Sequence, residues 1–212
     1  MFPARYTPSS ASPRWRALSA KLAWVLILGG GFYGLLSYQM RAGAPAVAPA
    51  VWPAGTDLPF DAHQYNLVMF AHPKCPCSVA SLEELKVVLT RGRGLIHASV
   101  CFFDPEGTPA GWADTRLVQA AREVPDLNVV MDRNGVLAGK FGALTSGQVL
   151  MFDGRGHRVF AGGITAARGH AGDNRGRGSV LALARNEMCG LDTTPVFGCA
   201  LHDAPVAKEQ AQ

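Results

Sequence analysis

The sequence predicts an α/β fold: a mixed β-sheet flanked by helices, preceded by a single N-terminal transmembrane helix. Short apolar, β-rich segments alternate with amphipathic stretches along most of the 212 residues, a pattern typical of parallel strands joined by helices. Two later apolar segments flank a Gly-rich turn, which predicts an antiparallel hairpin in the same sheet. A run of 19 uncharged residues near the N-terminus predicts the membrane helix.

The N-terminal part predicts a single-pass anchor in the inner (cytoplasmic) membrane. Residues 1–21 are polar and basic, and residues 22–40 carry no charge. At about 1.5 Å per residue, the uncharged run spans roughly 28 Å, close to the thickness of a hydrocarbon core. Because four basic residues precede it, the positive-inside rule places residues 1–21 in the cytoplasm and the rest on the periplasmic, extracytoplasmic side. A cleaved signal peptide ending near Ala42-Gly43-Ala44 is the alternative, and it also exports the domain.

Composition divides the chain after the membrane helix into a linker, a folded domain and a tail, and its net charge is close to zero. Five of the 20 basic residues lie within residues 1–41, so the rest carries 15 basic against 16 acidic residues and gives no reason to expect nucleic-acid binding. Residues 42–57 are rich in Pro and Ala and predict an extended linker that holds the domain away from the membrane. We expect the folded domain over residues 58–201 and a polar tail over 202–212.

Periodicity and turn signals place the elements of the domain in order. The expected strands lie at 65–70, 95–103 and 127–131, and at 148–152 and 158–162 in the hairpin. The expected helices begin after Ser78 and end near 91–94, then occupy 113–123 and 179–188, with a short helix or turn at 136–141. Ser81 and Glu84 match a capping-box pattern at the start of the first of these helices.

Two cysteines occupy the turn between the first strand and its helix. Cys75 and Cys77 lie around the expected helix N-terminus, where the helix dipole and unpaired N–H groups favour a thiolate, and we expect both thiols to be exposed. Pro76 suits the first helical position, and Lys74 adds a positive charge beside Cys75. A lowered thiol pKa predicts a nucleophilic cysteine, and His72 is a candidate auxiliary that tunes it.

These residues carry a resemblance. Pro73 to Cys77 resembles the thioredoxin-type Pro-x-Cys-x-Pro-Cys stretch with one residue removed between the cysteines. The string from His72 to Ser78, together with Thr194-Pro195-Val196-Phe197-Gly198-Cys199, is similar to bacterial RedB-like proteins of the thioredoxin-like superfamily. The resemblance covers about residues 58–201 and implies a thioredoxin-like fold, whose β-α-β-α-β-β-α order the elements above match.

One departure from that superfamily concerns the loop before the hairpin. Thioredoxin-like proteins usually place a cis-proline there, which faces the cysteines and aligns a partner chain. This chain has Leu144-Thr145-Ser146-Gly147 and no proline. The resemblance therefore does not extend to ordinary thioredoxin activity, and we expect poor reduction of general substrates such as insulin.

The remaining cysteines have different expected roles. Five cysteines in an exported chain leave at least one unpaired within the chain. Cys101 lies in an apolar strand, and we expect it to be a small, buried hydrophobic residue. Cys189 and Cys199 are ten residues apart, and either a structural disulfide between them or a resolving role for Cys199 is compatible with the sequence.

Three functional hypotheses follow. The first is a membrane-anchored thiol–disulfide oxidoreductase with catalytic Cys75 as nucleophile and Cys77 as resolving thiol, with His72, Lys74 and Cys199 auxiliary. Its partner is a dedicated exported protein with a disulfide or metal site, and it needs no cofactor. The second is a copper-handling assembly factor that binds the metal through Cys75, Cys77 and either His72 or His170. The third is a redox-inert interaction domain.

Overall fold

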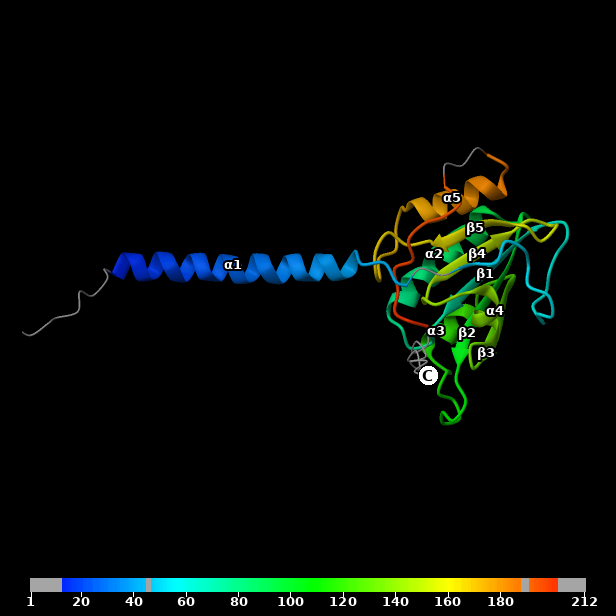
Figure 1. The fold of residues 1–212 in the computed structure, drawn as a ribbon, viewed down its shortest axis with the longest axis horizontal. Coiled ribbons are helices and arrows are strands. Elements are labelled where there is room, and N and C mark those ends of the chain that lie inside the picture. Colours follow the sequence, from blue (N-terminus) through cyan, green and yellow to red (C-terminus); the bar gives the residue numbers. More distant parts are fainter. Residues whose placement is uncertain (1–12, 45–46, 188–190, 202–212) are drawn as a thin grey trace, which may run out of the picture. The chain divides into compact units, whose positions relative to one another are not determined.

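The computed structural model describes residues 13–44, 47–187 and 191–201, which form two compact units divided after Gln39. In the first unit, helix α1 covers Pro13–Gln39, so it begins nine residues before the predicted span (Figure 1). Over Arg14–Gln39 it is long and apolar enough to cross a membrane. This length and composition fit a single-pass anchor and equally fit a signal sequence.

The second unit is built on a five-stranded mixed sheet in the order β3-β2-β1-β4-β5. Strands β1, β2 and β3 are mutually parallel, and β4 and β5 add antiparallel pairs beside β1. At the centre, Phe70 of β1 is paired with Cys101 of β2 on one side and with Gln148 of β4 on the other. The strands are β1 Tyr65–Ala71, β2 Ile96–Asp104, β3 Leu127–Arg133, β4 Gln148–Phe152 and β5 Arg158–Gly163.

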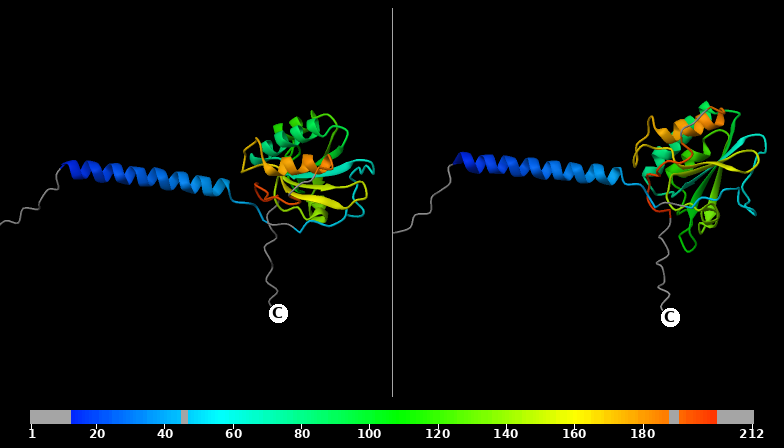
Figure 2. Two further views of the ribbon diagram at one scale, coloured as in Figure 1. Left: turned by 90° about the horizontal axis from the view of Figure 1, so that it is seen from above. Right: turned by 45° about the horizontal axis from the view of Figure 1, so that its top comes forward.

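Helices cover both faces of this sheet. One core joins the sheet to α2, α3 and α5 through side chains such as Leu85, Val118 and Val180. A second core, which we call the second core below, lies between the opposite face of the sheet and α4 and contains Phe141. Figure 2 shows α2 and α5 side by side over the sheet. The helices are α2 Cys77–Arg91, α3 Arg116–Arg122, α4 Val136–Phe141 and α5 Arg175–Ala184. The thioredoxin-like fold predicted from the sequence is confirmed, and residues 136–141 are a short helix.

Three helix starts differ from the sequence prediction. Helix α3 begins at Arg116 rather than residue 113, because the side chain of Thr115 caps it by accepting a hydrogen bond from the Val118 N–H. Helix α2 begins at Cys77, so Ser81 and Glu84 lie within it and the capping-box interpretation is wrong. Glu84 is instead buried and bonded to Arg177 of α5. Helix α5 begins at Arg175 rather than residue 179, because the side chain of Asn174 caps it by accepting a hydrogen bond from the Arg177 N–H.

Part of the Pro/Ala-rich segment packs on the domain. Trp52 inserts its indole among aromatic rings, with centroid distances of 5.2 Å to both Phe141 and Phe152. Val51 bridges His157 beside β5, with the Trp52 N–H donating to Gly156 at 2.8 Å. The contacts of Trp52 bury apolar surface that a free linker would leave in water. The structure therefore differs here from the predicted spacer, because part of the segment belongs to the second core.

Candidate functional site

Cys75 and Cys77 lie where β1 passes into α2, as the sequence predicts. The Cys75 N–H donates to the His72 carbonyl at 3.1 Å, which closes a turn after the strand. Pro76 is the N-cap residue, with helical dihedrals, and Cys77 is the first residue of α2. The expectation that both thiols are exposed is wrong for Cys75, which is 5% exposed, whereas Cys77 is half-buried.

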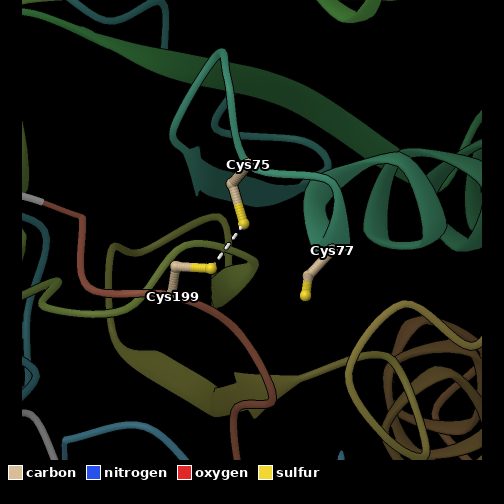
Figure 3. Close-up of side chains that lie close together, drawn as sticks. All are labelled: Cys75, Cys77 and Cys199. Carbon is tan, nitrogen blue, oxygen red and sulfur yellow. Dashed lines mark hydrogen bonds between the residues drawn. The ribbon is translucent and has the colours of Figure 1, made fainter.

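A third cysteine from the far end of the chain completes the site. The sulfur atoms of Cys75, Cys77 and Cys199 all lie within 4.8 Å of one another. Figure 3 shows Cys75 and Cys199 pointing toward each other, and their sulfur atoms are 3.1 Å apart. Cys189, which the sequence offers as a disulfide partner for Cys199, lies outside the described residues. The polar tail predicted over 202–212 lies outside them as well.

Cys199 reaches the site on residues 191–201, which we call the C-terminal strap. Backbone hydrogen bonds fix the strap along its length. Near its start, the Asp192 carbonyl accepts a hydrogen bond from the Ala161 N–H of β5 at 2.9 Å. At its end, the Leu201 N–H donates to the Leu144 carbonyl at 2.9 Å. The carbonyl of Cys199 itself accepts a hydrogen bond from the Ser146 N–H at 2.9 Å. The position of Cys199 is therefore set from both sides.

The loop that replaces the cis-proline faces the thiols. Gly147, with a positive φ of 91°, donates its N–H to Phe70 at the end of β1 (2.7 Å), and no cis peptide bond occurs in the described residues. The Ser146 hydroxyl accepts a hydrogen bond from the His72 N–H (2.7 Å) and lies 2.6 Å from the Ser78 hydroxyl. Sequence reasoning missed both serines as site residues. Their positions depend on this contact between segments 68 residues apart.

The environment separates the three thiols by acidity. Burial raises the pKa of Cys75, but hydrogen bonds from the Cys199 thiol and backbone, the Ser78 hydroxyl and the Cys77 backbone outweigh it, so the pKa lies below its usual value. Burial and the charge on Cys75 raise the pKa of Cys77. Burial and the hydrogen bond with Cys75 raise the pKa of Cys199 to about 12. Cys75 is therefore the most acidic thiol of the cluster, and the Cys199 thiol lies in hydrogen-bond contact with it.

Of the three predicted auxiliaries, Cys199 contacts Cys75, whereas Lys74 and His72 have other contacts. The ammonium of Lys74 lies 4.4 Å from the ring centroid of Trp112, a cation–π contact, and it is not among the groups that lower the Cys75 pKa. The His72 ring packs against Phe103 and Trp112, and its Nδ1 accepts a hydrogen bond from the Lys74 N–H at 3.1 Å. Burial and the charge of Lys74 lower the His72 pKa. His72 does not join the three sulfurs.

The other candidates lie apart from the cluster. Cys101 is buried in the second core, as predicted, and burial followed by the charge of Asp132 raises its pKa. His170, offered as a copper ligand, is exposed, with its Nδ1 2.8 Å from the carbonyl of Arg168. Arg168 adds a positive charge near Cys77 and so lowers its pKa against the larger effect of burial. The loop that carries Arg168 and His170 thus contributes a charge rather than a ligand.

Comparisons with known proteins support the fold. No protein-family model and no curated protein matches this chain at a significant level. Among solved structures, an uncharacterized conserved protein from Geobacillus kaustophilus has a TM-score of 0.57 at 17% identity, with 78% of this chain and 100% of that chain covered. A hypothetical protein from Sinorhizobium meliloti 1021 has a TM-score of 0.56 at 19% identity, with 76% and 93% covered. Likeness at this identity concerns the fold alone.

Proposed function

We propose that the protein is a membrane-anchored, exported thiol–disulfide oxidoreductase with Cys75 as its nucleophile. The observation that carries the proposal is the cluster of three thiols at the N-terminus of α2, in which Cys75 alone has a pKa below its usual value. The thiolate is the reactive form of cysteine, so this environment selects one sulfur for attack. The resemblance to RedB-like proteins remains a prediction that agrees with this chemistry.

The three thiols of the cluster supply both the nucleophile and the resolving thiol that disulfide exchange requires. The Cys75 thiolate attacks one sulfur of a partner disulfide, which forms a mixed disulfide and releases the other partner sulfur as a thiolate. A second thiol of the cluster then loses its proton to solvent and attacks the Cys75 sulfur. That step breaks the mixed disulfide, releases the second partner thiolate and leaves one disulfide in the protein. The partner is thereby reduced and the cluster oxidised, and the reverse sequence oxidises a partner dithiol.

The proposed location follows from α1 and the charges before it. The helix suits a single span, and the basic residues on its N-terminal side favour a cytoplasmic N-terminus with the domain on the periplasmic side of the inner membrane. Disulfide exchange is a reaction that an extracytoplasmic compartment permits. Protease added to intact spheroplasts should degrade the domain, and protection of the domain until lysis would contradict this orientation.

We propose a dedicated exported partner rather than general substrates. Cys75 is only 5% exposed, and Cys199 lies directly against it, so a partner sulfur has to enter where the strap now lies. A general substrate such as insulin offers nothing specific to displace the strap. We expect slow insulin reduction by the full-length protein in detergent, and fast, unselective turnover would contradict the proposed selectivity.

A direct test uses oxidised glutathione as the probe. The reduced full-length protein should form a glutathione adduct or an internal disulfide, and Cys75→Ser should abolish this reaction. Cys101→Ser is the matched control, because Cys101 is buried in the second core and should leave the rate unchanged. Equal reaction of the Cys75→Ser variant and the parent would show that Cys75 is not the nucleophile.

Copper handling is the second candidate, because three sulfurs within 4.8 Å form a donor set that suits Cu(I). The group consists of Cys75, Cys77 and Cys199, so neither His72 nor His170 belongs to it, in contrast to the ligand set considered from the sequence. Copper bound in a one-to-one ratio after reductive purification, and lost in a Cys75→Ser, Cys77→Ser double variant, would favour this function. Full redox activity without bound copper would favour the oxidoreductase.

A further inference from the structure

Resting on the proposed function, we propose that Cys199, rather than Cys77, is the resolving thiol. The redox-active disulfide then joins Cys75, before α2, to the C-terminal strap, and closing it ties the strap over the nucleophile. The proposal gives a role to the string at residues 194–199, which lies more than 100 residues from the Cys-Pro-Cys turn.

The geometry within the turn disfavours the Cys75–Cys77 pair. Pro76 has φ −60° and ψ −31°, so the backbone between the two cysteines already follows the helix. Residues two apart on a helix point to different sides, and their side chains do not face each other. The sulfurs of Cys75 and Cys77 lie within 4.8 Å of each other, but a disulfide between them would need the backbone around Pro76 to change conformation.

Cys199 needs no comparable rearrangement. Its sulfur is 3.1 Å from that of Cys75, so the two atoms have to approach by about 1 Å to reach a disulfide length of about 2.05 Å. In Figure 3 the side chains of Cys75 and Cys199 point toward one another, whereas the Cys77 sulfur lies to one side. Shortening a contact in place is the smaller change.

The strap holds Cys199 at this position. The Ser146 N–H binds the Cys199 carbonyl, and the Leu201 N–H binds the Leu144 carbonyl, both at 2.9 Å. Leu201 is 1% exposed and packs in the second core, which anchors the strap just after the cysteine. A thiol fixed in this way has a high effective concentration at Cys75.

The reaction follows in two displacements. A partner disulfide is attacked by the Cys75 thiolate after the strap moves aside, which yields the mixed disulfide and a partner thiolate. The strap then returns, Cys199 gives its proton to solvent, and its sulfur displaces the remaining partner thiolate from Cys75. Formation of the mixed disulfide has by then removed the negative charge of Cys75, which otherwise disfavours ionisation of Cys199. Cys77 keeps its proton throughout.

The test is a single turnover with 5,5′-dithiobis(2-nitrobenzoate) as the disulfide probe. The parent is the full-length chain in detergent with Cys101→Ser and Cys189→Ser, so that only the three clustered thiols remain. The variants add Cys77→Ser or Cys199→Ser to this parent. Cys77→Ser should release two thionitrobenzoate anions, the second from ring closure. Cys199→Ser should release one and keep the other as a stable mixed disulfide, with closure at least about tenfold slower.

Peptide mapping identifies the product. Trypsin places Cys75 and Cys77 in one peptide, 75–86, and Cys199 in another, 186–208, so a Cys75–Cys199 bond links two peptides and a Cys75–Cys77 bond links none. Rapid closure in Cys199→Ser, whether or not Cys77→Ser also closes, would overturn the assignment of Cys199 and leave the proposed function standing. A parent that forms no internal disulfide would instead reject the proposed function.

Discussion

Replacing Glu84 by alanine should destabilise the domain, because the change leaves a buried cation without its main partner. The Glu84 side chain is 2% exposed and accepts hydrogen bonds from Arg177 (2.6 Å), Asn174 (3.1 Å) and the Gly172 N–H (2.5 Å). The Arg177 side chain is 9% exposed. Removing one member of a buried ion pair typically costs about 3–5 kcal/mol.

The remaining contacts of Arg177 place the cost toward the lower end of that range. Asp173 also pairs with Arg177, but its side chain is 99% exposed, and exposed ion pairs contribute little. We therefore expect Glu84→Ala to lower the free energy of unfolding by about 3 kcal/mol. The bonds that Glu84 accepts from Gly172 and Asn174 also hold the loop that carries Arg168, so this loop should loosen with the ion pair.

Urea unfolding of the full-length protein in detergent, followed by circular dichroism, measures the effect. Glu83→Ala is the matched control, because Glu83 is the preceding residue in α2 but is 51% exposed and pairs with Lys86 on the same helix surface. Its loss should cost less than about 0.5 kcal/mol. Equal stability of the Glu84→Ala and Glu83→Ala variants would refute the argument that the Glu84–Arg177 pair holds α2 to α5.

Three further predictions address the thiolate, the strap and the membrane helix. Because the Cys75 pKa lies below its usual value, the alkylation of Cys75 by iodoacetamide should reach half its maximal rate at a lower pH than in a denatured control. At neutral pH, Cys75 should also be alkylated faster than Cys101, whose pKa is raised. Mass spectrometry across pH measures both rates, and equal rates for Cys101 and Cys75 would contradict the assignment of Cys75 as nucleophile. Gly198→Ala should slow closure of the Cys75–Cys199 bond, since a Cβ at residue 198 would lie 1.9 Å from the Ser146 carbonyl oxygen. Gly178→Ala is the control, because a Cβ at residue 178 would have no atom within 4 Å and should leave the closure rate unchanged. Equal closure rates in the two variants would contradict the contact between the strap and Ser146. Full-length protein should stay in the membrane fraction after carbonate extraction, and a mature N-terminus near Ala44 would show cleavage instead.

Local patterns predict the first part of the site well. The strand, the cysteine turn and the helix are contiguous, so apolar periodicity and the preference of proline for helix starts suffice to place Cys75 and Cys77. The same local reasoning fails for Glu84, because a Ser-x-x-Glu pattern also occurs inside helices and does not reveal a partner 93 residues away. Local reasoning also fails for the Pro/Ala-rich segment, which it predicts to be a free linker. The large side chain of Trp52 favours burial, and it packs in the core that contains Phe141.

The position of Cys199 depends on contacts that no local pattern encodes. The strap is held by a few separate hydrogen bonds to β5 and to the loop before β4, and it forms neither a regular strand nor a helix whose periodicity the sequence could reveal. The string from Thr194 to Cys199 marks the region only through the resemblance. What the sequence cannot supply is the distance between Cys75 and Cys199, on which the proposed resolving role of Cys199 rests.

The missing proline and the strap are two parts of one arrangement. The Ser146 N–H donates to the Cys199 carbonyl, and a proline has no N–H to give, so a proline at this position could not hold the strap. Thr145, the residue before it, bridges Ala200 in antiparallel fashion. The loop edge that aligns a partner chain in thioredoxin-like proteins is therefore occupied here by the chain's own C-terminal strap.

This coupling predicts the outcome of Ser146→Pro. The variant loses the bond to Cys199, so the strap should detach more often, ring closure between Cys75 and Cys199 should slow, and insulin reduction should rise as Cys75 becomes accessible. Any affinity of the three sulfurs for copper or zinc should fall, because Cys199 leaves the group. Ser146→Ala is the control that keeps the N–H and loses only the hydroxyl contacts with His72 and Ser78. If Ser146→Ala slows closure as much as Ser146→Pro, the hydroxyl rather than the backbone bond positions the site, and the link between the missing proline and the strap is wrong.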